Sequence, residues 1–320
     1  MHKIQKSRRI LIKIIIIFAS LINSLVILIG KKSIIIKKKL SLKKSSKTKV
    51  AMCAIAKTEN RYIKYFLEFY KNLGYDHIYI YDNNDIDEAP ISSLPLAKQL
   101  INEGYLSVID YKKRTGNLVT ESFHICYKDF NSQYDWISFY DIDEYLMLEP
   151  KNLSIQDCLD SPQFNNCESV QFNWRLFTDN EQLDFEDKSP VERFPVETNY
   201  IYENRNVKST IRGGLNKIKE TDSPHTIYEN LKACSSSGKP TNNKYELWPP
   251  DFAFGALNHY RTKTVKEYFR KMVKTKKEVD NVDKLELLTT MAYFNYFFMV
   301  NKMTREKVNI FNQLFHTNYQ

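Results

Sequence analysis

The run WISFYDIDEYLML, residues 136–148, places three carboxylates inside an otherwise apolar stretch. Its first part, Trp136–Tyr140, is short, aromatic and β-branched, which predicts a buried strand. Asp141, Asp143 and Glu144 follow this strand directly. Because a carboxylate at the end of a buried strand is costly unless it is paired, these side chains predict a cation at this point of the chain.

The spacing of Asp141 and Asp143 suits a hard divalent cation. In an extended chain, residues i and i+2 point to the same face, roughly 6.6 Å apart at about 3.3 Å per residue. Mg²⁺ and Mn²⁺ prefer oxygen ligands and usually take one or two carboxylates, while substrate phosphates fill other positions. The pair therefore predicts a Lewis-acid site that neutralises a leaving diphosphate. A surface turn with acidic residues placed by chance is the alternative, and the apolar flanks on both sides argue against it.

Two further polar clusters follow predicted strands. KTEN (Lys57–Asn60) comes after the apolar run Val50–Ala56, and DNND (Asp82–Asp85) comes after HIYIYD, residues 77–82. Because ligands bind at the carboxyl ends of the strands in an open parallel sheet, all three clusters are expected to meet on one rim. Neither G-x-G-x-x-G nor G-x-x-x-x-G-K-[ST] occurs in the sequence, so a metal rather than a glycine-rich loop is expected to hold phosphate there.

The elements that must position these clusters alternate between strand and helix. Strands are expected at residues 50–56, 77–82, 105–111, 136–140, 168–174 and 256–260. Helices are expected at about 60–73, 94–103 and 118–130, then at 263–277, which is amphipathic and basic, and from 284 onward. This alternation predicts an α/β fold with a mostly parallel sheet flanked by helices. Residues 178–250 show few clear elements.

Composition and charge narrow the class of protein. The chain has 320 residues and is 42% hydrophobic, enough for one large domain or two small ones. Residues 1–50 hold 14 of the 47 Lys and Arg and none of the 38 Asp and Glu, so the remainder carries 33 basic and 38 acidic residues, a net charge of −5. The positive charge belongs to the N-terminal tail, which argues against a nucleic-acid partner.

The five cysteines contain no CxxC pair, so a zinc site is not expected. Cys53 and Cys126 stand in apolar stretches, which favours buried free thiols. Disulfide bonding among Cys158, Cys167 and Cys234 is expected if the domain lies outside the cytoplasm.

The segment Ile10–Gly30 is long and apolar enough to predict a transmembrane helix that acts as a signal anchor. A cleaved signal peptide is the alternative, but no A-x-A-like cleavage site follows the segment. Residues 1–9 then form a basic tail, 31–49 a basic stalk, 50–280 the main domain and 281–320 a helical extension. The chain is expected to be a single-pass membrane protein, type II in the Golgi or endoplasmic reticulum if eukaryotic. Both flanks of the span are basic, so the positive-inside rule leaves its orientation open.

Four stretches carry a family resemblance that covers roughly residues 50–275. AMCAIAKTEN, YKNLGYDHIYIYDNNDID, YDWISFYDIDEYL and LNHYRTKTVKEYF together resemble the GT-A glycosyltransferases of the family 2 and family 92-like group. The resemblance implies a GT-A fold, in which a Rossmann-like nucleotide-binding half merges with an acceptor-binding half. It also implies that Asp141 and Asp143 form the metal-binding D-x-D motif of these enzymes, with Mn²⁺ or Mg²⁺ as cofactor.

The resemblance extends to the nucleotide-sugar pocket. It implies that Glu59, Asp82 and Asn83 line the site for the nucleoside, where a carboxylate could accept hydrogen bonds from ribose hydroxyls or a base N–H. It implies that His259 in NHY is a further metal or diphosphate ligand, since a neutral imidazole suits Mn²⁺. A buried core histidine at a strand end is the alternative for His259.

Further positions resemble family residues. Lys208 and Arg212 in VKSTIRGG match a basic patch that could contact the diphosphate, with a plain surface role as the alternative. Trp174 resembles a tryptophan that faces the acceptor sugar, although a core position explains it equally well. His225 after Pro224 is a weaker candidate of the same kind.

The function predicted from these observations is metal-dependent transfer of a sugar from a nucleotide-sugar donor, expected to be UDP-linked, to a glycan or lipid-linked acceptor. The alternatives are a nucleotidyl- or phosphotransferase on the same rim, or a non-catalytic sugar-binding protein. An inverting enzyme would need a carboxylate base. Asp179 and Asp184 fall in a plausible region, but the segment Thr178–Glu181 departs from the family pattern, and the base stays unassigned.

Overall fold

The described part of the chain leaves out its N-terminal segment. The computed structural model describes all residues except 1–46, 113, 115, 217, 277–282 and 320. The predicted anchor at 10–30, the basic tail and nearly all of the stalk therefore lie outside the described residues. Among the described residues, no helix is both long and apolar enough to span a membrane.

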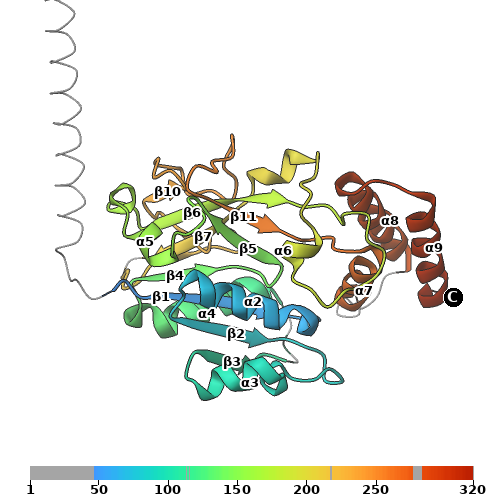
Figure 1. The fold of residues 1–320 in the computed structure, drawn as a ribbon, viewed down its shortest axis with the longest axis horizontal. Coiled ribbons are helices and arrows are strands. Elements are labelled where there is room, and N and C mark those ends of the chain that lie inside the picture. The colour runs from blue at the N-terminus through green and yellow to red at the C-terminus, as the bar shows by residue number, and fades with distance from the viewer. Residues whose placement is uncertain (1–46, 113, 115, 217, 277–282, 320) are drawn as a thin grey trace, which may run out of the picture. The chain divides into compact units, whose positions relative to one another are not determined.

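A nine-stranded sheet forms the centre of the unit Thr48–Gln320 (Figure 1). Its order is β3 (Leu106–Asp110), β2 (His77–Asp82), β1 (Val50–Ala56), β4 (Trp136–Phe139), β7 (Val207–Arg212), β6 (Ser169–Leu176), β11 (Gly255–His259) and β5 (Glu144–Leu148), with β10 (Ala233–Ser235) beside β6. A separate two-stranded ribbon joins β8 (Lys219–Glu220) and β9 (Tyr228–Glu229).

The pairing of the strands divides the sheet into two halves. β3, β2, β1 and β4 are all parallel, which confirms the predicted βαβ units. β7 runs antiparallel to both β4 and β6, and β5 runs antiparallel to β11, so the second half is mixed. Strands β5 and β7 were not predicted, because β5 continues the acidic turn after β4 and β7 lies in the polar region 178–250.

Helices cover both faces of the parallel half (Figure 1). They are α2 (Asn60–Leu73), α3 (Pro95–Asn102) and α5 (Ile155–Leu159) in one core and α4 (Leu118–Phe130) in the other. The other short elements are α6 (Pro190–Arg193), η1 (Ile91–Ser93), η2 (Asn131–Gln133), η3 (Pro162–Phe164) and η4 (Ile201–Arg205). Alternate residues of β1 enter opposite cores, because successive side chains of a strand point to opposite faces. Met52 packs in the core that includes α2, α3 and α5, and Ala51 packs in the core that includes α4.

A C-terminal helical unit follows the sheet. It contains α7 (Val265–Lys276), α8 (Asp283–Val300) and α9 (Arg305–Tyr319), which share a small aromatic core that includes Phe269, Phe297 and Phe311. The helical prediction for this end of the chain is confirmed. Its first helix, α7, directly follows β11 and is thereby held close to the rim of the sheet.

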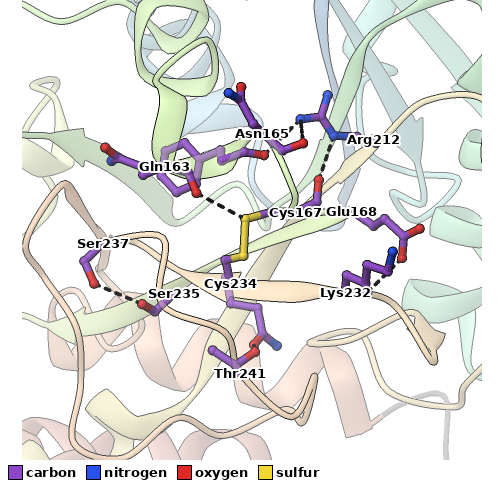
Figure 2. Close-up of a disulfide and its surroundings, with 12 residues drawn as sticks. Gln163, Asn165, Cys167, Glu168, Arg212, Lys232, Cys234, Ser235, Ser237 and Thr241 are labelled. Atoms are coloured by element: carbon purple, nitrogen blue, oxygen red, sulfur yellow. Dashed lines mark hydrogen bonds between the residues drawn. A yellow bond between two sulfur atoms is a disulfide. The ribbon is translucent and has the colours of Figure 1, made fainter.

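Two disulfides link segments that are far apart in the sequence. Cys167 pairs with Cys234, which joins the segment before β6 to β10 (Figure 2) and confirms one predicted bridge. Cys53 pairs with Cys126, so the prediction of free thiols at these positions is wrong. Both cysteines belong to the core between β1 and α4, where the fold brings them together across one face of the sheet. Cys158 on α5 is buried and free.

This pairing predicts the thiol count of the protein. Without reductant, the denatured chain should react with one equivalent of iodoacetamide, at Cys158, and after reduction with five.

Removing one bridge, as in the double variant Cys167→Ser/Cys234→Ser, should lower the free energy of unfolding by about 2–4 kcal/mol, because the unfolded chain gains conformational freedom. Mass spectrometry of labelled peptides and chemical denaturation would check both statements. Five reactive thiols in the non-reduced oxidised protein would contradict the pairing.

Candidate active site

One rim of the sheet gathers the ends of several strands. The carboxyl ends of β4, β6 and β11 lie there, and so does the start of β7, because β7 runs antiparallel to β4 and β6. This reversed direction places Lys208, near the start of β7, opposite Phe172 of β6 and close to the acidic segment after β4. The topology therefore brings a lysine to the acidic rim that the sequence predicted.

The acidic segment after β4 is a turn. The Glu144 N–H donates to the Asp141 carbonyl at 3.0 Å, and the buried Ile142 side chain anchors the loop. The premise that Asp141 and Asp143 extend from one face of a straight strand is therefore wrong. The chain must reverse here, because β5 starts at Glu144 and belongs to a different part of the sheet. Both carboxylates still lie at the rim, but they contact different cations.

Lys208 neutralises the first carboxylate of the motif. Its buried Nζ lies 2.9 Å from Asp141 Oδ2 and 3.9 Å from Glu144 Oε2. Glu144 is fully buried, and its Oε2 accepts the Asp141 N–H at 2.8 Å. Burial raises the pKa of Glu144 well above its usual range despite the opposing effect of Lys208. The cation at this end of the rim is thus an ammonium group.

A second set of cations surrounds Asp143. Lys271 Nζ lies 2.7 Å from Asp143 Oδ2 and 3.3 Å from Glu59 Oε1. Lys263 Nζ donates to both carboxylate oxygens of Glu59, at 3.1 and 2.9 Å. Burial by itself would raise the pKa of Asp143, but the cations around it, Lys271 first, hold that pKa well below the usual range. Asp143 is therefore held as a carboxylate at neutral pH.

His259 completes this side of the rim. Its Nε2 lies 3.5 Å from Asp143 Oδ1, and the Trp174 ring packs against the imidazole with centroids 4.2 Å apart. Burial lowers the pKa of His259, which favours the neutral form that can act as a ligand. The buried Nδ1 of His259 has no hydrogen-bond partner among the described residues.

The donor groups of the rim fit a partial metal site. Among the described residues, no three His, Cys, Asp or Glu side chains are grouped as a complete cage. Mg²⁺ and Mn²⁺ do not need one, since they commonly take one or two carboxylates and complete their shell with water and substrate phosphates. Asp143 and His259 lie close enough to share an ion, and the Asp141 side chain is 34% exposed.

A cavity of about 240 Å³ opens beside Glu59. Its lining has an excess of two positive charges, because it contains five cationic and three acidic side chains. The cationic ones are Arg61, Arg261, Lys263, Arg270 and Lys271, and the acidic ones are Glu59, Glu88 and Glu267. The N-terminus of α2, at Asn60, also lines the cavity. Because the first turn of a helix presents unpaired N–H groups and a positive partial charge, this end of the cavity favours an anion.

Two residues that line this cavity have left-handed backbone conformations. Thr58 has φ of 58° and Lys263 has φ of 49°. A β-branched residue such as threonine rarely adopts a positive φ, and such strain is commonly found at functional sites. The Thr58 N–H donates to Asn84 Oδ1 at 2.9 Å, which helps to hold the strained turn in place.

Only one of the three residues predicted to line the nucleoside site lies at the cavity. Glu59 lines the cavity, whereas Asp82 and Asn83 are not among the lining residues. The Asp82 carboxylate accepts the N–H groups of Asn84, at 3.1 Å, and Ile91, at 2.9 Å. Asp82 thereby fixes the loop after β2, which contributes Glu88 to the cavity wall.

The structure does not bring Arg212 to the rim. Arg212 lies at the end of β7, opposite Trp136 at the start of β4, and thus four residues, roughly 13 Å, along the strand from Lys208. Its guanidinium donates to the carbonyls of Cys167, at 2.6 Å, and Phe164, at 2.9 Å, next to the disulfide (Figure 2). Arg212 therefore has a structural role at the opposite end of the sheet.

Trp174 and His225 form one wall of the rim. Trp174 is 6% exposed, and its ring lies against both His259 and His225, with centroids 4.2 and 5.0 Å apart. His225 Nδ1 lies 2.9 Å from the Val207 carbonyl. Burial lowers the pKa of His225 to about 4, and the charge of Lys208 adds to the effect. Trp174 thus supports the two imidazoles rather than offering an open ring face.

The two carboxylates considered as catalytic bases lie elsewhere. Asp179 is buried, forms an ion pair with Lys307 at 2.6 Å and accepts the Glu181 N–H, so it anchors α9 to the sheet. Asp184 is exposed and pairs with Lys266 on α7. Neither lines the cavity.

The cations of α7 and the loop before it were missed by the sequence predictions. Lys263 and Lys271 were seen only as part of a basic amphipathic helix. Glu267 and Lys271 are four residues apart, which places them on one side of α7, and Lys263 stands four residues before Glu267 in the loop that precedes the helix. That spacing, directly after His259, was the available signal.

Comparison with known proteins identifies the family. The profile of glycosyltransferase family 92 matches residues 48–294, more than three quarters of the chain. The chain belongs to glycosyltransferase family 92. The enzyme class predicted from the acidic rim and the family resemblance, a glycosyltransferase, is thereby confirmed. A search of curated proteins gave no significant match.

Comparison with solved structures gave distant similarities. A fragment of S. aureus TarS, residues 1–349, matches with a TM-score of 0.37 and 10% identity over 85% of this chain and 73% of that one. The same fragment in complex with UDP matches with a TM-score of 0.37 and 12% identity over 78% of this chain and 71% of that one. S. aureus TarS matches with a TM-score of 0.36 and 11% identity over 78% of this chain, which covers 43% of TarS. Similarity at this level says nothing about the ligands of this family 92 chain.

The low pKa of His225 predicts a pH dependence of stability. Its pKa rises from about 4 in the folded state to about 6.5 in the unfolded state, so the unfolded chain binds the proton more tightly. This contribution to stability is complete above pH 6.5 and is lost as the pH falls towards 4. Between pH 7 and pH 4.5, the free energy of unfolding should fall by about 2 kcal/mol more in the wild type than in His225→Gln. Urea denaturation at both pH values would measure the difference, and equal losses would contradict the prediction.

Proposed function

We propose that this family 92 enzyme transfers a sugar from a nucleotide-sugar donor, UDP-linked, to a glycan or lipid-linked acceptor, with the donor diphosphate bound at the cationic rim. The observation that carries the proposal is the meeting of Lys263 and Lys271 with Glu59 and Asp143 beside a cavity of about 240 Å³. The cavity offers an excess of positive charge, a helix N-terminus and carboxylates for hydroxyl groups in one place. A nucleoside diphosphate combines the matching groups.

The lysines would exchange partners when the donor binds. With the rim as described, Lys208 and Lys271 neutralise Asp141 and Asp143. A diphosphate entering the rim can accept hydrogen bonds from the same ammonium groups, which are flexible donors on long side chains. As the glycosidic bond breaks, negative charge collects on the leaving phosphate, and cations that are already in position stabilise it. This arrangement makes the lysines leaving-group stabilisers.

Asp141, Asp143 and His259 would hold the proposed Mn²⁺ or Mg²⁺. When bound, the ion supplies Lewis-acid neutralisation of the leaving diphosphate. The support for this assignment is the pair Asp143 Oδ1 and His259 Nε2, 3.5 Å apart, together with the partly exposed Asp141 carboxylate. Lys271 must release Asp143 for this to happen, and the diphosphate provides its new partner.

The disulfides support a location for the domain. Bridges such as Cys53–Cys126 and Cys167–Cys234 persist in oxidising compartments and are rare in the cytosol. We propose that the family 92 domain faces the lumen of the secretory pathway, or the outside of the cell, and that residues 10–30 anchor it in the membrane as a type II protein.

The carboxylates of the rim provide the direct test of the proposed mechanism. Asp143→Asn and Asp141→Asn should each lower sugar transfer by roughly 100-fold or more, because a neutral amide binds the proposed Mn²⁺ or Mg²⁺ more weakly than a carboxylate does, and the leaving diphosphate then loses its Lewis acid. Release of the nucleoside diphosphate from a panel of UDP-, GDP- and CMP-linked sugars, with Mn²⁺ present, would measure the effect. Asp129→Asn on the exposed face of α4 is the matched control and should retain full activity. Wild-type activity that persists in excess EDTA would contradict the metal assignment.

Lys271 tests the proposed diphosphate contact. Lys271→Met should raise the KM for the donor about tenfold, since one charge-assisted hydrogen bond to phosphate is lost. Lys271→Arg keeps the positive charge and should retain most of the affinity. Lys98→Met on α3 removes an exposed lysine outside the cavity and should leave the donor KM unchanged. A donor KM in Lys271→Met equal to that of the wild type would show that Lys271 has only a structural role.

A further inference from the structure

Three exposed aromatic side chains lie on two paired segments next to the rim. Tyr202 belongs to η4, and Tyr245 and Trp248 belong to residues 245–248. The two segments are joined by a hydrogen bond from the Leu247 N–H to the Arg205 carbonyl at 2.7 Å and by an antiparallel bridge between Asn206 and Glu246. Tyr202, Tyr245 and Trp248 are called the aromatic platform below.

The exposure of the platform is unusual for this chain. Trp248 is 62% exposed, Tyr202 54% and Tyr245 50%, whereas the other tryptophans, Trp136 and Trp174, are 1% and 6% exposed. Large aromatic side chains normally bury much of their surface, so a group of them in solvent marks a binding surface.

Buried polar side chains hold the platform in place. Asn173 on β6 is fully buried, and its Nδ2 donates to the Leu247 carbonyl at 3.0 Å. Gln171 Nε2 donates to the Lys244 carbonyl at 2.8 Å, and Asn173 Oδ1 accepts the Asp251 N–H at 3.0 Å. A loop fixed on both sides in this way presents its rings in a defined position, which lowers the entropic cost of binding.

The platform is continuous with the candidate active site. Glu203 of η4 accepts hydrogen bonds from Arg261, at 3.0 Å, and Tyr296, at 2.8 Å, and Arg261 lines the cavity. The backbone N–H of Trp174 donates to the Asn206 carbonyl at 2.8 Å, and Lys208 follows Asn206 by two residues. Residues 201–208 therefore run from the platform to the acidic rim without a break.

We propose that the aromatic platform is a carbohydrate subsite that binds the acceptor glycan, one or more sugar units away from the hydroxyl that receives the new sugar. The proposal rests on the proposed sugar transfer and specifies its acceptor as a saccharide long enough to reach from the rim to Trp248. The platform selects the acceptor and takes no part in donor binding.

The chemistry of the platform fits a sugar ring. The faces of aromatic rings carry negative partial charge and attract the polarised C–H groups on one face of a pyranose. The hydroxyl edges of the sugar need hydrogen-bonding groups nearby. The guanidinium of Arg205 lies over the Tyr202 ring at 3.7 Å and covers one face of it, and it pairs with Glu246 at 3.1 Å, so the same two segments also carry hydrogen-bond donors and acceptors.

A membrane surface is the competing occupant. Tryptophan and tyrosine also collect at lipid interfaces, and a membrane anchor is predicted for this chain. The ion pair between Arg205 and Glu246 favours the saccharide, because a sugar hydroxyl can donate to the carboxylate and accept from the guanidinium, whereas a phosphocholine head group offers acceptors and no donor. The two occupants are separated by experiment as follows.

The test uses the detergent-solubilised full-length chain on an array of defined oligosaccharides of the N-linked, O-linked and glycolipid head-group classes. The wild type should bind a subset of them, and Trp248→Ala should lose about tenfold in affinity for that subset. Trp248→Phe should retain most of the binding. Met303→Ala, which removes another exposed apolar side chain, is the matched control and should bind as the wild type does. Binding by Trp248→Ala equal to that of the wild type, or no array binding by the wild type, would overturn the proposal.

Two accompanying measurements keep the outcomes distinct. Hydrolysis of nucleotide sugars without acceptor should be equal in Trp248→Ala and the wild type; a matching loss would place Trp248 in the donor site and overturn its assignment to the acceptor. If the wild type hydrolyses no nucleotide sugar, the proposed function fails, whatever the array shows.

A quenching experiment in nanodiscs tests the membrane as occupant. The fluorescence of Trp248 is obtained as the difference between the wild type and Trp248→Phe. Brominated phosphatidylcholine should not quench this fluorescence. Strong quenching would assign the platform to the membrane.

Discussion

The pairing of buried carboxylates with lysine ammonium groups is the constraint on which the rim depends. Glu59 and Asp143 are both buried, and unpaired charges in such positions would cost several kcal/mol each. Lys263 and Lys271 compensate them, and Lys208 pairs with Asp141 at the other end of the acidic turn. Because each ammonium can also bind phosphate, the groups that keep the rim folded are suited to receive the charged donor of a family 92 glycosyltransferase.

This constraint explains why the second half of the sheet is mixed. A parallel β7 would carry Lys208 to the far end of the sheet, whereas the antiparallel strand starts at the rim and delivers the lysine beside Asp141. The turn after β4 serves the same purpose, since it lets Asp141 and Asp143 contact different cations. The first helix of the C-terminal unit, α7, contributes Lys271 and so joins the helical unit to the acidic rim.

The region between β6 and β11 holds the surfaces that a donor site alone would not need. It contains Cys234, which is bonded to Cys167, together with η4 and the loop of Trp248, which the buried amides of Gln171 and Asn173 fix to β6. Rigid support of exposed rings is what a recognition surface requires, because a flexible loop would lose entropy on binding. The contacts that hold this region together would thus also fix the proposed acceptor surface.

Local patterns in the sequence determined the βαβ half of the fold, the acidic rim and the family. Strands such as Val50–Ala56 and helices such as Leu118–Phe130 have periodicities that neighbouring residues define, and the structure reproduces both ranges. Only the tertiary structure decided which cation meets which carboxylate, that Cys53 pairs with Cys126, and that Arg212 lies away from the rim. These features depend on the direction and order of strands that are distant in the chain, and no local period of hydrophobic or charged residues encodes them.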